Sequence, residues 1–257
     1  MPKTYNILLL SLFIDKLNKY EPAIVDMIKF YIKTYTFETN DKLCRAIELY
    51  DDNNTREEAI KKYGKIELWD VSKITTMSYL FNSSSLNQDF SLWDVSNVID
   101  MSDMFANSDF TGDISNWDVS KVKNMSKMFY YSSFNGDLSR WNVSNVENMS
   151  EMFYHSEFNK DVSKWNVSNL KTLSFMFAHT HFNQDISKWD VSRVEDMRGL
   201  FCLSNFNGDI SNWDVSNVKF IDVIFLHSDF EGDISKWDIS NSNTPSKREI
   251  LKYSAIK

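Results

Sequence analysis

The stretch WDVSKVKNMSKMFYYSSFNGDLSR, residues 117–140, recurs in variant form along most of the chain. Its first residue marks the period, because all eight tryptophans of the chain fall at intervals of 24 residues. A fixed period of this length is typical of a solenoid, in which each unit buries its apolar face only against neighbouring copies. We therefore predict one rod of stacked coils and expect its function to lie on its surface. The tryptophans are Trp69, Trp93, Trp117, Trp141, Trp165, Trp189, Trp213 and Trp237.

Four further columns are apolar in every coil when each tryptophan is position 0. Position 2 is Val or Ile, position 8 is Met, Leu or Ile, position 12 is Phe, and position 17 is Leu or Phe. Aromatic and thioether columns can indicate a cofactor box, but their recurrence in each coil favours ladders in the core. We predict that these columns line the interior and carry no chemistry.

The spacing of Ile114, Trp117 and Val119 matches the L-x-x-L-x-L pattern of a leucine-rich repeat. It predicts a short parallel strand over about Ser115–Ser120, followed by a helical turn that Ser120 caps. The Asn or Cys that usually follows such a strand is replaced by an apolar residue, so buried backbone groups need another ladder. The helical turn is expected to carry Val122, Met125, Met128 and Phe129.

Both ends of the repeat are expected to be covered by helices, which divides the chain into residues 1–65, 66–240 and 241–257. Pro22 suits the first turn of a helix over Ala23–Tyr35, and a second helix is expected over Asp41–Leu49. Thr55 and Glu58 form a capping box for a third helix, which Gly64 ends. At the other end, Thr244 and Pro245 are expected to open a helix that runs to about Ala255.

The repeat W-D-V-S-N-V-x-x-M-S-x-M-F-x-x-S-x-F-N-x-D-I-S-x, seen in residues 93–116 and 141–164, resembles the BspA-like leucine-rich-repeat family. This is the repeat of mycoplasma-type surface lipoproteins, which also occurs in protists and large DNA viruses. The resemblance covers about two thirds of the chain, and Tyr63–Ile66 resembles the segment that precedes such arrays. It implies an α/β solenoid wound as a right-handed, leucine-rich-repeat-like superhelix with roles in protein interaction or adhesion. The chain lacks the cysteine near its start that a lipoprotein would carry.

Composition excludes several classes of function. The repeat region holds the whole acidic excess of a chain with net charge -8, which disfavours binding to nucleic acid. Cys44 and Cys202 are too few for a disulfide framework or a four-ligand zinc site. No stretch approaches the roughly 20 apolar residues of a membrane span. The apolar run Ile7–Ile14 has the length of a signal-peptide core but also suits a packed helix.

A column of aspartates occupies position 20 of every complete coil. Stacked carboxylates repel one another unless each accepts backbone N–H bonds or shares cations. We expect each Asp to cap a turn at the entry to its own strand, and calcium between coils is the alternative. The column consists of Asp89, Asp113, Asp137, Asp161, Asp185, Asp209 and Asp233.

The middle coils carry a candidate patch for a protein partner. Position 1 changes there from Asp to Asn, which suggests that an acceptor oxygen is needed and not a charge. Cations precede the tryptophans of the same coils, and Tyr and Arg are favoured at interfaces. The residues are Arg140, Asn142, Lys164, Asn166, Lys188, Tyr130, Tyr154 and His155, with Tyr131, His179 and His181 beside them.

These patterns favour a non-enzymatic interaction or structural module whose partner is another protein. No Ser, Cys or His set shows the logic of a catalytic triad, and no phosphate-binding or dinucleotide-binding glycine motif occurs. A secreted or surface adhesin is one alternative, and an adaptor whose N-terminal helices recruit a second protein is another. We expect an intracellular or virion-associated location, with a surface location tied to the adhesin alternative.

Overall fold

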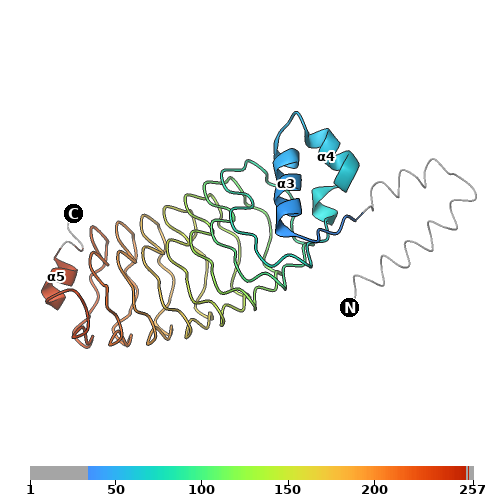
Figure 1. Ribbon diagram of the computed structural model, residues 1–257. Coiled ribbons are helices and arrows are strands. Elements are labelled where there is room, and N and C mark those ends of the chain that lie inside the picture. Colours follow the sequence, from blue (N-terminus) through green and yellow to red (C-terminus); the bar gives the residue numbers. More distant parts are fainter. Residues whose placement is uncertain (1–33, 253, 255–257) are drawn as a thin grey trace, which may run out of the picture.

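The computed structural model describes residues 34–252 and residue 254. Coils of 24 residues follow one another in chain order along a rod, which begins beside α3 and α4 and ends beside α5 (Figure 1). Coil 1 begins at Trp69 and coil 7 at Trp213. The helices are α3 (Asn40–Asp51), α4 (Arg56–Tyr63), the 3-10 helix η1 (Ile66–Leu68) and α5 (Lys247–Leu251).

One segment of each coil, positions 7 to 14, forms what we call the turn ladder. Parallel bridges join its first residue to the same position of the next coil, as in Asn124 with Asn148. The N–H groups of Met125 and Phe129 then donate to the carbonyls of Asn148 and Met152, each at 2.9 Å. Between these bonds, the N–H of Met128 donates to Met125 within its own coil at 3.2 Å. Backbone groups therefore pair alternately with the next coil and with the same coil.

This pattern requires left-handed backbone at positions 10 and 14. Lys127 has φ 56° and Tyr131 has φ 50°, and the equivalent residues of the other coils have similar values. Residues with side chains rarely adopt this conformation, which costs about 1 to 2 kcal/mol each. The bonds between coils offset that cost, since the turn ladder leaves few backbone groups of the middle coils without a partner.

The predicted strand and helical turn are wrong in their conformation and place. Residues 115–120 contain two turns, and the bridge lies at Asn124. The carboxylate of Asp118 accepts from the N–H of Ser120 at 3.0 Å, which holds a turn where a strand was expected. The left-handed residues then prevent a helix from forming after Ser120. The wider class, a right-handed leucine-rich-repeat-like solenoid, stays a prediction.

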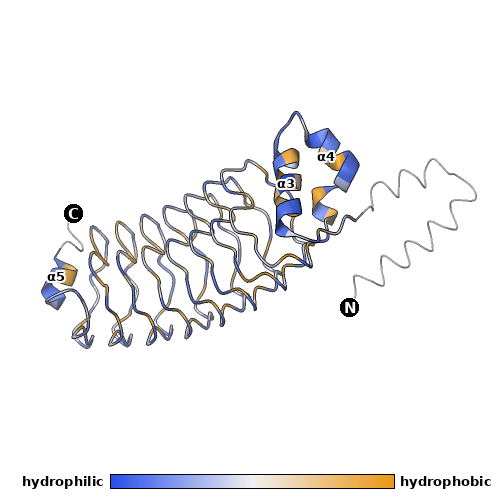
Figure 2. Ribbon diagram, in the orientation of Figure 1, coloured by the Kyte–Doolittle hydropathy of each residue, from blue (hydrophilic) through white to orange (hydrophobic). Residues whose placement is uncertain are grey.

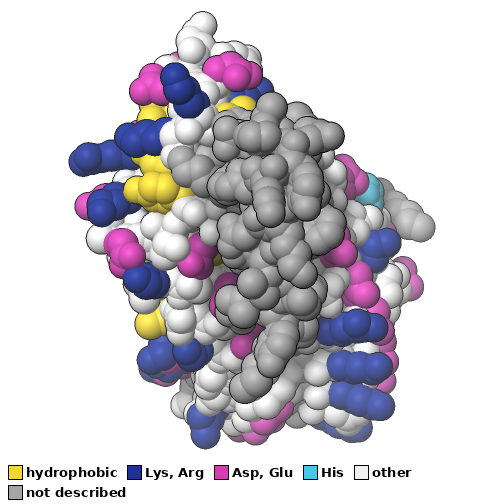
Figure 3. Space-filling view, turned by 90° about the vertical axis from the view of Figure 1, so that its right-hand side faces the viewer, with side chains coloured by type: hydrophobic (Ala, Val, Ile, Leu, Met, Phe, Trp, Pro, Cys, Tyr) yellow, Lys and Arg dark blue, Asp and Glu magenta, His cyan; other side chains and the backbone are white. Residues whose placement is uncertain are grey.

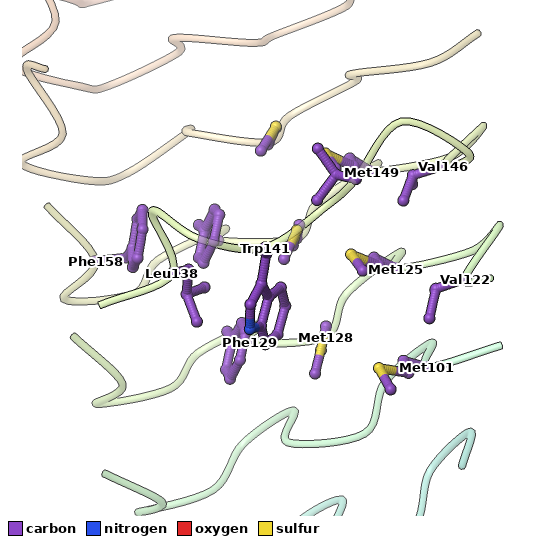
Figure 4. Close-up of a cluster of buried hydrophobic side chains, with 14 of the residues drawn as sticks. Met101, Val122, Met125, Met128, Phe129, Leu138, Trp141, Val146, Met149 and Phe158 are labelled. Atoms are coloured by element: carbon purple, nitrogen blue, oxygen red, sulfur yellow. The ribbon is translucent and has the colours of Figure 1, made fainter. Parts of the chain in front are cut away.

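The core holds the apolar columns, which confirms their predicted burial. The tryptophan, Val or Met at positions 0, 2 and 8 of coils 3 and 4 is at most 4% exposed. Met101, Met125 and Met149 follow one another along the rod, and the Trp141 indole lies beside the Phe129 ring (Figure 4). Hydrophobic and hydrophilic residues are mixed along every coil, because each coil turns one set inward (Figure 2).

From Trp117 onward, each indole also joins two coils through a hydrogen bond. Trp165 donates from Nε1 to the carbonyl of Leu138 at 2.9 Å, and Trp189 donates in the same way to Val162 at 3.1 Å. The carbonyl of Leu138 also accepts from the backbone N–H of Trp141 at 3.0 Å. Tryptophan is thus placed where a large apolar ring and one buried donor are both needed.

The N-terminal cap closes the first coil with aromatic rings. The rings of Phe37 and Tyr63 lie 4.9 and 5.9 Å from that of Trp69. Thr39 caps α3 through the N–H of Lys42 at 3.4 Å. The predicted capping box is wrong, because the Thr55 hydroxyl donates to the carbonyl of Leu49 at 2.8 Å. Of the helix expected over 23–35, residues 34 and 35 are not helical, and the rest lies outside the described residues, as does the run over 7–14.

The C-terminal cap replaces an eighth turn ladder. Asn243 accepts from the N–H of Ile221 through Oδ1 at 3.3 Å, in place of a backbone carbonyl. The predicted helix start is wrong by two residues, because Ser246 caps α5 through the N–H of Glu249 at 3.3 Å. Its predicted end at residue 255 lies outside the described residues.

Candidate interaction surfaces

The structure divides the predicted patch into two surfaces. The first, which we call the cation face, lies at the positions next to the tryptophans, and all its side chains are exposed. Asn142 and Asn166 accept from the N–H groups of Ser144 and Ser168 through Oδ1, each at 3.2 Å. Asp118 does the same, which confirms that an acceptor oxygen is the shared requirement. The cation face consists of Arg140, Asn142, Lys164, Asn166 and Lys188.

The second surface is a row of stacked rings on the turn ladders of coils 3 to 5, which we call the aromatic strip. Tyr130 and Tyr154 lie 5.1 Å apart between ring centroids, and Tyr131 and His155 lie 4.4 Å apart. His179 continues the row at 5.6 Å from His155. Tyr131 is 45% exposed, so the strip presents apolar ring surface to solvent. The strip consists of Tyr130, Tyr131, Tyr154, His155 and His179.

Partial burial sets the proton affinity of the strip. It raises the pKa of Tyr130 and of Tyr154, whose hydroxyls therefore stay neutral. It also lowers the pKa of His179, and the neighbouring His155 adds to that effect. The ammonium of Lys127 lies 5.6 Å from the centre of the Tyr130 ring. These shifts favour the neutral forms of Tyr130, Tyr154 and His179.

The hydrophobic core separates the two surfaces. Phe177 points inward from a turn ladder and Trp189 from the segment that carries the cation face, and their rings meet at 6.2 Å. Within the described range, no hydrogen bond, ion pair or ring contact joins the cation face to the aromatic strip. A single partner patch made from both sets is therefore not what the fold presents.

Two of the four histidines, His155 and His179, belong to the strip; His181 lies two residues after His179, and His227 occupies position 14 of coil 7. His181 contacts the side-chain oxygen of Asn205 through Nδ1. In the part of the chain that the structure describes, no group of three or more His, Cys, Asp or Glu residues could hold a metal ion. The spacing of His179 and His181 is thus explained by stacking and by an amide contact.

The aspartate column at position 20 forms turns. Asp113 and Asp161 accept from the N–H groups of Ser115 and Ser163 at 2.9 and 2.8 Å. This bond lowers the pKa of both carboxyls, with a smaller opposing effect of burial. The expected backbone bonding is confirmed, whereas the strand that Asp was expected to cap is absent at residues 115–120. Calcium between the coils stays a prediction.

A groove that sequence reasoning missed runs along positions 4 and 6. Its volume is 670 Å³, and the residue at position 6 in its wall alternates between Lys and Glu from one coil to the next. Lys171 pairs with Glu147 at 2.5 Å, and Lys219 pairs with Glu195 at 2.7 Å. Charges of both signs are interspersed over the end of the molecule seen in Figure 3. The alternation of Lys and Glu at position 6 was the available signal.

An asparagine ladder at position 18 was also missed. Asn159 donates its N–H to Oδ1 of Asn135 at 3.0 Å, and Asn183 donates in turn to Asn159 at 3.2 Å. Asn207 continues the series at 2.9 Å. This is one place where side chains supply the ladder that the apolar residue after the predicted strand could not supply.

The comparisons with known proteins identify a family. The profile described as Mycoplasma protein of unknown function, DUF285, matches residues 48–159 and 155–250. Because these segments cover most of the chain, the protein belongs to this mycoplasma-type repeat family. No curated protein and no solved structure matches the chain. In the described residues, no helix is long and apolar enough to cross a membrane.

Proposed function

We propose that this protein is a non-enzymatic module that binds another protein through the aromatic strip. The observation that carries the proposal is the contiguous row of partly exposed rings on three successive coils. Aromatic residues held at such a surface contribute strongly to protein interfaces, because they lose little side-chain entropy on binding.

The turn ladder supports this role by fixing the rings before a partner arrives. Tyr131 and His155 each have a left-handed backbone, and their N–H groups donate to carbonyls of the next coil at 2.8 and 3.0 Å. A preorganised surface loses less freedom on association than a flexible one. The resemblance of the repeat to BspA-like leucine-rich repeats agrees with an interaction role.

The experiment compares proteins captured by the full chain and by three variants. In the first, Tyr131→Ser and His155→Ser remove the exposed centre of the strip. Leu203→Ser is the matched control, because Leu203 occupies position 14 of another coil and is 44% exposed. The third variant carries Arg140→Glu, Lys164→Glu and Lys188→Glu on the cation face.

We expect a set of proteins that the wild type and Leu203→Ser retain and the strip variant loses. Direct binding of one purified member must show the same order. An unchanged set with the strip variant would refute the role of the strip. Loss with the triple glutamate variant alone would move the interface to the cation face.

A further inference from the structure

The cation face presents hydrogen-bond donors where the other coils present charged acceptors. Asn142 and Asn166 each use Oδ1 to accept from the backbone N–H two residues later. This bond leaves Nδ2 of both amides available, and no hydrogen bond joins either Nδ2 to a residue in 34–252 or 254. At the same position, Asp118 and Asp190 close the same turn with one carboxylate oxygen and present the second. Replacement of Asp by Asn thus changes the outward group from a charged acceptor to a donor.

The three cations of the face have no close partner of their own. No hydrogen bond or ion pair joins Arg140, Lys164 or Lys188 to any residue that the structure describes, whereas Lys171 and Lys219 each pair with a glutamate. The aspartate column attracts these cations only from a greater distance. Bonds to serine are the main cause of its lowered pKa values, and the three cations add to the effect. The face therefore offers charges and donors that a ligand can still engage.

A hollow lies at one end of the cation face. It has a volume of 280 Å³, and its lining includes Arg140 and Asn142 together with Asn116, Trp117 and Asp118 of the preceding repeat. Ligand sites begin at about this size, which suits a side chain and not a folded domain. Among the lining residues, Asp118 is the only acid, so negative charge returns at this end of the face.

The charge pattern along the rod limits the length of an anion that can bind here. At the positions just before and after Trp141 and Trp165, each coil carries one cation and no acid. The same positions beside Trp189 carry one of each, and those beside Trp117 and Trp213 carry an acid and no cation. The three cations span two coil steps, roughly 10 Å at about 4.8 Å for each step. A long polyanion would lie over acidic coils on both sides, whereas a short acidic segment would not.

We propose that the cation face binds a short acidic segment of a partner protein. Its carboxylates pair with Arg140, Lys164 and Lys188 and accept from the Nδ2 groups of Asn142 and Asn166. Side chains on one side of an extended segment repeat at roughly 6.6 Å, so acidic residues at two or three alternate positions match the length of the face. Hydrogen bonds between charged groups of this kind are short and strong. The site lies on a different surface from the aromatic strip and does not depend on the proposed function.

The first test is NMR of the full chain with a synthetic peptide of sequence Glu-Ser-Glu-Ser-Glu and blocked ends. We expect the side-chain amide signals of Asn142 and Asn166, and the Nε–H signal of Arg140, to shift at low salt. The amide of Asn217 should not move, because it lies in the groove and donates to the carbonyl of Ser192 at 2.7 Å. A peptide with Gln in place of Glu should cause no shift at any of these groups.

The second test measures binding of the labelled peptide by fluorescence anisotropy. The variant Asn142→Asp with Asn166→Asp keeps the oxygen of each turn, as in the coils that carry Asp, and replaces each outward donor by a charged acceptor. We expect it to weaken binding about tenfold or more at low salt, because like charges then face one another. The matched control is Ser85→Asp with Ser133→Asp, which adds the same charge at an exposed position where another coil carries Asp109. The control should bind nearly as well as wild type, and circular dichroism must show that both variants keep the wild-type fold.

Three results would overturn the proposal. The first is the absence of shifts at Asn142 and Asn166 with millimolar acidic peptide. The second is equal binding by wild type and by the variant with two new aspartates, or an equal loss in the control. The third comes from heparin fragments as a further probe: binding tighter than that of the peptide, with a strength that grows with fragment length, would make a polyanion the ligand.

Discussion

Replacement of Trp165 by Phe tests the hydrogen bond that its indole makes to Leu138, which lies three residues before the preceding tryptophan, Trp141. The substitution removes a buried donor, 2.9 Å from the carbonyl of Leu138, and part of a side chain that is 4% exposed. That carbonyl keeps its bond to the N–H of Trp141 at 3.0 Å, so no acceptor is left without a partner. The lost bond is worth about 1 kcal/mol. The smaller ring adds about 1 to 2 kcal/mol.

We therefore expect Trp165→Phe to lower the free energy of unfolding by about 2 to 3 kcal/mol. Urea denaturation followed by circular dichroism measures it, with an unchanged m value as the sign that only stability has changed. Phe158→Leu is the control, since it removes buried ring area without a hydrogen bond. A loss below about 0.5 kcal/mol would refute the reasoning, because ordinary surface substitutions have effects of that size.

Three further substitutions test other parts of the structure. Asp113→Asn keeps the oxygen that binds Ser115 but cannot titrate. The pKa of Asp113 is lowered in the folded protein, so the contribution of this carboxylate to stability is present at neutral pH and is lost as pH falls through the folded pKa. Tm should therefore depend less on pH below about 4 in the variant than in wild type. An equal dependence would exclude the role of this carboxylate. Gly199→Ala places a Cβ 2.1 Å from the ring of Phe175 at φ 59°, and we expect a loss of about 1 to 2 kcal/mol in urea denaturation; a neutral effect would show that the left-handed position is not needed. Lys171→Glu replaces the cation between Glu147 and Glu195 by a third carboxylate on adjacent coils, and Tm should fall. About 1 M salt should largely restore Tm, since the Debye length is then about 3 Å. A fall in Tm that does not depend on salt would indicate an effect on packing instead.

The sequence was informative about which side chains face inward. The period of the tryptophans placed the Val, Met and Phe columns in the core, and all of them are buried in coils 2 to 6. This worked because an apolar residue that recurs in every coil is expected in the core, whatever conformation the backbone adopts. Position 1 is exposed between the buried residues at positions 0 and 2, as in Asn142.

The local backbone could not be predicted in the same way. Val122, Met125, Met128 and Phe129 have the spacing of a helix face, but consecutive turns bring the same residues inward. Left-handed positions are usually signalled by Gly or Asn, whereas here Lys127 and Tyr131 occupy them. Bonds to the next coil impose this conformation, and a single coil does not reveal them.

The division of the candidate patch into two surfaces was not predicted, for a related reason. Tyr131 and Arg140 are close in sequence, so their residues were grouped together. The chain turns around the core between them, so the two sets of residues lie on separate surfaces. The rings of Phe177 and Trp189 meet in the core between these surfaces.

Distances between spin labels test the stacking of the coils most directly. Cys44 and Cys202 are first replaced by Ala, and cysteine pairs then join Asn116 to Lys188, Asn212 or Lys236, all at the position before a tryptophan. Equivalent rings of adjacent coils such as Phe129 and Phe153 lie 5.7 Å apart, and strands pair at about 4.8 Å. Pulsed electron paramagnetic resonance should therefore give about 15, 20 and 25 Å, rising in equal steps. Distances that do not rise with each added coil would contradict a rod of stacked 24-residue units.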